Sequence, residues 1–142
     1  MSYRRSLALA VAFALLAGAA PAATVKYHAA LTAGAEVPPT NSTGTGEANA
    51  TLDTATHELA YDVTFSGFSS DVTAAHIHGP APAGKNAGVL VPLGNAPKSP
   101  IHGSAKLTAE QEQQLAAGEL YVNVHTKNHP SGAIRGQLTK AP

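Results

Sequence analysis

Two histidines one residue apart are the residues of this sequence best suited to chemistry. His76 and His78 flank Ile77 in an apolar run that predicts a β-strand. Side chains alternate between the two faces of a strand, so both imidazoles project from the same face. A third imidazole, His125, lies in a second such run, 121–126. Imidazole nitrogens are common ligands of copper and zinc, and the three residues therefore predict a metal site.

The same alternation places His125 and an arginine on the polar faces of two later strands. In 120–126 every second residue is apolar, which leaves the opposite face to Tyr121, Asn123 and His125. In 133–139 the inward positions are Ile134 and Leu138, so Arg135 points outward with Gln137. If these strands are near neighbours, we expect one outer sheet surface to carry His76, His78, His125 and Arg135.

Two further histidines are weaker ligand predictions. His102 stands at the start of a predicted strand, and His129 precedes Pro130 in the loop after His125. Either residue could supply a fourth ligand or form a hydrogen bond to a ligand without binding the metal itself. The sequence leaves the choice open. A lone histidine on a polar face is usually just solvated, and a lone arginine usually pairs with a surface carboxylate. The spacing of His76 and His78 favours the metal site over these alternatives.

Composition restricts the kind of metal site and of partner. The chain has 142 residues and no cysteine, so thiolate ligands and disulfides are excluded. Removal of a signal peptide with Arg4 and Arg5 would leave seven basic against nine acidic residues. That balance provides no basic patch for nucleic acid. A site in this chain must use imidazoles and carboxylates.

Residues 1–22 have the features of a signal peptide. Arg4 and Arg5 precede the apolar stretch 7–16, and Ala20-Pro21-Ala22 supplies small residues for cleavage after Ala22. The apolar stretch is shorter than the roughly 20 residues of a membrane span. We expect an exported domain over 23–142, periplasmic or secreted, without a membrane span.

Period-two alternation predicts an all-β fold. The predicted strands are 25–31, 47–52, 59–65, 72–78, 88–91, 101–107, 120–126 and 133–139. Segment 108–118 is the exception: Thr108 and Gln111 form a capping box and Gly118 ends a short helix. The Pro- and Gly-rich stretch 79–88 is a predicted loop that shapes access to the histidines. We expect a Greek-key-like antiparallel β-sandwich of about eight strands with one short helix.

Four segments together resemble the CHRD domain, a family named after its occurrence in chordin. They cover nearly the whole mature chain, in the order LTAGAEVPP at 31–39, AHIHGP at 75–80, GELYVNVHT at 118–126 and GAIRGQL at 132–138. The resemblance implies one CHRD domain over 23–142 and a stand-alone exported protein. Members of the family in chordin belong to an extracellular antagonist, whereas bacterial members are mostly stand-alone exported domains.

The histidine pair and the late arginine are also similar to copper-zinc superoxide dismutases. That resemblance implies that His76, His78 and His125 bind copper and that Arg135 is a catalytic residue, guiding the superoxide anion. The chain lacks that enzyme's cysteines and an obvious zinc-binding loop. We therefore predict a copper site, with zinc as second choice, and superoxide dismutase activity as one candidate function. The alternative is a non-catalytic extracellular or periplasmic module that binds an unidentified protein partner.

Overall fold

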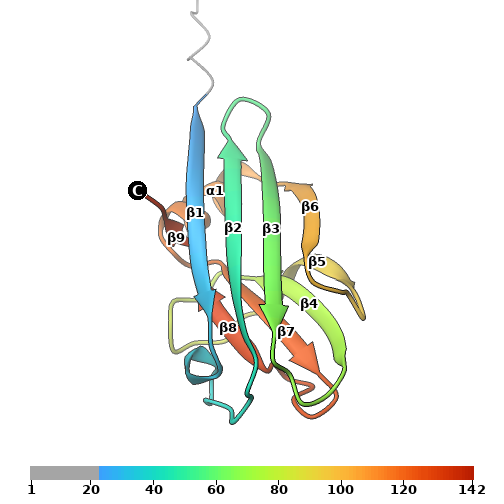
Figure 1. Cartoon of the computed structure of the whole chain (residues 1–142). Helices are drawn as coiled ribbons and strands as arrows, with labels where there is room; N and C mark the ends of the chain where they lie inside the picture. The colour runs from blue at the N-terminus through green and yellow to red at the C-terminus, as the bar shows by residue number, and fades with distance from the viewer. Residues whose placement is uncertain (1–22) are drawn as a thin grey trace, which may run out of the picture.

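The computed structural model describes residues 23–142 as two antiparallel β-sheets packed face to face (Figure 1). The predicted signal peptide, 1–22, lies outside the described residues. The five-stranded sheet contains β1 (Thr24–Leu31), β2 (Thr45–Asp53), β3 (Glu58–Ser66), β6 (Ile101–Lys106) and β9 (Thr139–Lys140). The four-stranded sheet contains β4 (Val72–His78), β5 (Val89–Asn95), β7 (Tyr121–Thr126) and β8 (Ile134–Gln137).

Strands that are distant in sequence are neighbours in both sheets. The order is β6-β3-β2-β1-β9 in one sheet and β5-β4-β7-β8 in the other. The chain changes sheets between β3 and β4, and it returns to the first sheet between β5 and β6. The predicted all-β sandwich is confirmed, and a further crossing, between β6 and β7, places β7 beside β4.

The structure has nine strands among residues 23–142, where the sequence predicted eight. The predicted strand 133–139 is divided at Leu138, whose side chain is buried in the core. Before this residue β8 pairs with β7, and after it β9 pairs with β1 in the other sheet. Alternation gave no sign of the division, since Leu138 points inward in either case.

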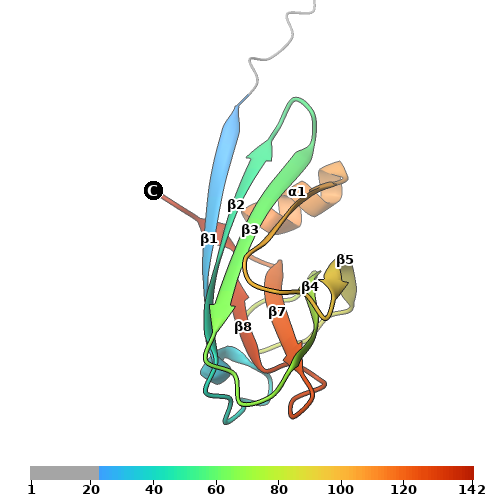
Figure 2. The ribbon, with the colours of Figure 1, turned by 45° about the vertical axis from the view of Figure 1, so that its right-hand side comes forward.

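The predicted helix is confirmed as α1 (Ala109–Ala116), with the capping box of Thr108 and Gln111 in place. Figure 2 shows α1 behind the upper part of the five-stranded sheet, where the other sheet does not reach. Leu115 anchors it in the core with no exposed surface. Within residues 23–142, no helix has the length and apolar character needed to cross a membrane.

The core lies between the sheets, yet β7 is buried on both faces. Val122 and Val124 face the core, as the alternation predicts, together with Ile77 of β4. On the opposite face, Tyr121, Asn123 and His125 are also at most 9% exposed. Loop 79–88 covers this outer face, and a hydrogen bond from Asn86 to the Val37 carbonyl oxygen joins it to segment 32–44. The four-stranded sheet thus has a polar layer beneath its loops.

Candidate metal centre

Three imidazoles converge in this polar layer. His76 and His78 extend from β4 and His125 from the adjacent β7, whose register sets Ala74 opposite His125 and His76 opposite Asn123. One ring nitrogen from each histidine lies within 4.8 Å of the other two. The closest pair is His76 Nδ1 and His125 Nε2, 2.9 Å apart. The structure therefore brings together the three histidines that alternation placed on one side of the strands.

Backbone carbonyl groups orient two of the rings. His78 Nδ1 donates to the Ala87 carbonyl oxygen at 3.0 Å, and His125 Nδ1 donates to that of Pro130 at 3.0 Å. A carbonyl oxygen can only accept, so each Nδ1 carries the hydrogen in a neutral ring and each Nε2 keeps its lone pair. This is the arrangement by which proteins commonly orient histidine ligands of metals.

The lone pair of His78 has no partner in the protein. Its Nε2 is the one buried side-chain nitrogen or oxygen among residues 23–142 without a hydrogen bond. Leaving a buried polar atom unpaired is costly, and a bound metal ion would satisfy it. His76 differs, because its Nδ1 must donate to the lone pair of His125 Nε2. Coordination through His76 Nδ1 would require that hydrogen to move to Nε2.

The spacing of the nitrogen atoms fits one metal ion. Imidazole ligands lie about 2.0–2.1 Å from zinc, so two nitrogens on one ion are at most about 4.2 Å apart. The three ligand atoms lie within 4.8 Å of one another, so small ring rotations suffice to close the site. The donor set is nitrogen only, which favours copper or zinc over calcium or magnesium.

Burial keeps the three rings neutral. It lowers the pKa of His76, His78 and His125 below the ordinary value of 6.5. The neighbouring imidazoles lower the pKa of His76 further, while the hydrogen bonds to backbone carbonyls partly oppose the shift in His78 and His125. Neutral imidazole is the form that binds metal ions.

The expectation that His76, His78, His125 and Arg135 lie on an outer surface is wrong in one respect, the exposure of their side chains. They do lie on the outer face of one sheet, but His78 is 8% exposed, His125 9% and Arg135 1%. Loop 79–88 folds back over this face and is fixed to it through the hydrogen bonds of Ala87. Only His76 is partly exposed among the three histidines, so it marks the accessible side of the site.

Arg135 lies beneath the same loop and is engaged with it. Its guanidinium carbon is 3.5 Å from the centre of the Tyr121 ring. Its terminal nitrogens donate to Asn86 Oδ1 and to the Pro82 carbonyl oxygen in the loop, and to Gln137 Oε1 in β8. The alternation that turns Arg135 toward this face was predicted, and its contacts show that it holds the loop.

Glu36 is a further member of the polar layer that the sequence analysis did not include. It is 7% exposed and accepts a hydrogen bond from Asn123 Nδ2. Burial raises its pKa to about 7, against the opposing influence of Asn123 and the Arg135 charge. Gly132, with φ +135°, passes so close that a Cβ atom would lie 2.6 Å from the Glu36 carboxylate. Nothing in the local sequence around Glu36 indicated this burial.

The structure places the two weaker ligand predictions outside the group of three. His102 belongs to β6 in the five-stranded sheet and contacts the Asp62 carboxylate on β3. His129 lies closer in sequence to His125, but its Nε2 is bonded to Asn41 Oδ1 at 2.9 Å. Neither joins the set of mutually close ligand atoms.

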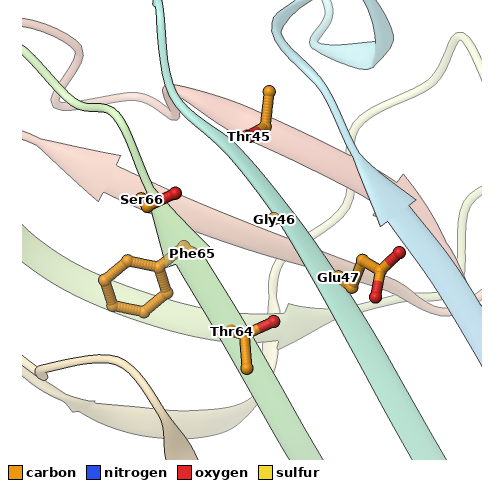
Figure 3. Close-up of a pocket in the computed structure, with 6 residues that line it drawn as sticks. All are labelled: Thr45, Gly46, Glu47, Thr64, Phe65 and Ser66. Atoms are coloured by element: carbon orange, nitrogen blue, oxygen red, sulfur yellow. The ribbon is translucent and has the colours of Figure 1, made fainter.

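A hollow elsewhere on the molecule offers less chemistry. Figure 3 shows it between the ends of β2 and β3, in the five-stranded sheet. Its lining consists of Thr45, Gly46, Glu47, Thr64, Phe65 and Ser66. Glu47 is its one ionisable side chain, and no imidazole is among the lining residues. The three histidines are therefore the better candidate for a functional site.

Comparison with protein families agrees with the sequence resemblance. A family model described as the CHRD domain matches residues 27–138, which include every strand from β2 to β8 and all three histidines. The searches of curated proteins and of solved structures gave no match to this chain. Because the family model covers most of the sequence, the chain belongs to the CHRD domain family.

Proposed function

We propose that this protein is an exported domain that binds copper through His76, His78 and His125. The observation that carries the proposal is the buried, unpaired Nε2 of His78, positioned beside two other imidazoles. A site of neutral nitrogen donors without thiolates suits Cu(II) best among the common divalent ions, with zinc second. When bound, copper supplies one-electron redox chemistry.

Export is supported by two observations. The pattern of residues 1–22 is that of a signal peptide. CHRD domains are typically extracellular or periplasmic, and the matched region begins shortly after this segment. A periplasmic or secreted location would also place the protein where metal ions arrive from outside the cell.

Metal content tests the proposal directly. Protein purified from its native compartment should carry close to one copper per chain by elemental analysis. Calorimetric titration of the metal-free protein with Cu(II) should show one tight site, which the double variant His76→Ala/His78→Ala should lose. The matched control is His28→Ala/His102→Ala, which removes two exposed imidazoles from the other sheet. Unchanged copper affinity in the first double variant would overturn the proposal.

Superoxide dismutation is the candidate activity of the copper-loaded domain. The partial exposure of His76 supports it, because a small anion needs access to the site. Arg135 would act through the long-range attraction of its charge, since its nitrogens are bonded to loop 79–88. Rapid superoxide consumption that slows with added salt is expected if this holds. Copper binding without turnover would instead identify a carrier or storage protein.

The alternative is a non-catalytic interaction module, in which the imidazoles only form hydrogen bonds within the polar layer. Native protein with no copper or zinc, together with weak copper binding in calorimetry, would favour this function. The metal analysis therefore separates the two classes before any assay of activity.

A further inference from the structure

Tyr121 is the residue in closest parallel contact with a proposed ligand. Its ring lies over that of His78, with centroids 5.0 Å apart and planes only 4° from parallel. The two residues are opposite each other in the register of β4 and β7. Tyr121 is 3% exposed, so the contact is shielded from water. A parallel ring at this distance restricts the tilt of the imidazole plane.

Tyr121 also reaches His78 through Ala87. The Tyr121 hydroxyl accepts from the Ala87 amide at 3.0 Å and donates to the Ala87 carbonyl oxygen at 3.2 Å. That oxygen also accepts the hydrogen of His78 Nδ1. The hydroxyl therefore positions the acceptor that determines which nitrogen of His78 carries the hydrogen.

Arg135 supports Tyr121 from the other neighbouring strand. β4 and β8 flank β7 on opposite sides, so His78 and Arg135 approach the Tyr121 ring from two different strands. A guanidinium group 3.5 Å from the ring centre makes a favourable cation–π contact. The same guanidinium binds Asn86 and Pro82, which holds the loop that contains Ala87.

We propose that Tyr121 is a positioning residue of the metal centre, which fixes the plane of the His78 ring and keeps its Nε2 available as a ligand atom. Arg135 holds Tyr121 and loop 79–88 in the arrangement that this requires. The link to metal binding rests on the proposed copper site. The orientation of His78 is a property of the metal-free protein and is testable by itself.

Two variants separate the ring of Tyr121 from its hydroxyl. Tyr121→Phe keeps the stacking surface and removes both hydrogen bonds to Ala87. Tyr121→Leu removes the aromatic ring as well and keeps an apolar side chain in place. Tyr27→Phe is the matched control, because Tyr27 is another buried tyrosine, 3% exposed, on β1 of the other sheet. Circular dichroism establishes that each variant is folded.

Three measurements follow the consequences for His78. Nitrogen-15 NMR of metal-free protein reports which imidazole nitrogen is protonated, calorimetry gives the copper dissociation constant, and electron paramagnetic resonance reports the Cu(II) environment. In Tyr121→Phe we expect His78 to become a mixture of both neutral forms, with copper binding weakened several-fold. In Tyr121→Leu we expect about 10- to 100-fold weaker binding and an altered Cu(II) spectrum, the range typical for residues that orient ligands. Tyr27→Phe should match the wild type in all three.

The proposal is overturned if folded Tyr121→Leu protein retains the wild-type dissociation constant and Cu(II) spectrum. Should Tyr121→Leu not fold, Tyr121→Phe decides, because an unchanged, single protonation state of His78 would contradict the role of the hydroxyl. If the wild-type protein binds no copper, the proposed function fails. The NMR comparison then still decides whether Tyr121 orients His78.

Discussion

The outer faces of the two sheets both carry histidines, but in opposite environments. On the five-stranded sheet, the strand register places His28, Asn49, Asp62 and His102 in one row across β1, β2, β3 and β6. The side chains of His28 and His102 are 42% and 66% exposed, and each lies near a carboxylate. On the four-stranded sheet, His78 and His125 are covered by loops and bonded to backbone carbonyls.

Burial beneath loops, rather than position along a strand, therefore distinguishes the histidines that can form a metal site from those that cannot. All of these residues occupy polar positions of alternating strands. An exposed imidazole can exchange its partners with water. The covered imidazoles of His78 and His125 have lowered pKa values, and a backbone carbonyl fixes the Nδ1 of each so that Nε2 keeps its lone pair. The loops of the four-stranded sheet therefore create the conditions for a metal site.

The largest predicted effect is the loss of copper binding on removal of a covered imidazole. His125→Ala should weaken copper binding about 100- to 1,000-fold, since a structural zinc site of four ligands gains about 10–16 kcal/mol, or roughly 3–4 kcal/mol per ligand. His102→Ala, on the exposed face, should leave the dissociation constant unchanged. Calorimetric titration of both folded variants measures the difference. Equal losses in the two variants would contradict the assignment of the site to the covered face.

The next effect concerns the stability of the covered face. Arg135→Met keeps the apolar stem but removes the hydrogen bonds to Asn86, Pro82 and Gln137. Leaving buried groups unpaired should lower the free energy of unfolding by about 3 kcal/mol. Lys127→Met is the control, because its exposed pair with Asp71 should contribute nothing measurable. Denaturant unfolding measures the free energy of unfolding of both variants. An equal loss of stability in the two would contradict this prediction.

The sequence was sufficient to predict most of the strands, the capped helix and the three histidines that the structure brings together, because these follow from local patterns, whereas the division of 133–139 into β8 and β9 does not. His76, His78 and Ile77 illustrate this, since two-residue alternation fixes their faces without tertiary information. The cover of the site was not predictable in the same way. The hydrogen bonds to Ala87 and Pro130 involve backbone atoms that any residue possesses. Likewise, Glu36 is buried against Asn123 of β7 and the backbone of Gly132, far away in sequence.

Glu36 should make the stability of the covered face depend on pH, with stability falling as pH rises. Its pKa is about 7 in the folded protein and 4.5 in an ordinary environment, so the folded state holds the proton more tightly. Its contribution to stability is complete below pH 4.5 and is lost as pH rises through about 7. Glu36→Gln should remove this loss, and the variant should gain about 2 kcal/mol relative to wild type between pH 5 and pH 8.

Unfolding measurements in urea at several pH values test the role of Glu36. Glu47→Gln is the control, because that carboxylate is exposed on the five-stranded sheet. Parallel stability curves for wild type and Glu36→Gln across this range would show that Glu36 ionises normally in the folded protein.

The smallest predicted effect is the dependence of copper affinity on pH. Because burial lowers the pKa of all three imidazoles below 6.5, protons should compete with copper only at more acidic pH. Affinity should therefore be nearly constant from pH 7.5 to about 6.5 and fall at least about tenfold by pH 5. Titrations against a competing chelator of known pH dependence measure this, with circular dichroism to show that the protein is folded at pH 5. Equal affinity at pH 5 and pH 7.5 would argue against an all-imidazole site, since protons compete with the metal ion for each imidazole lone pair.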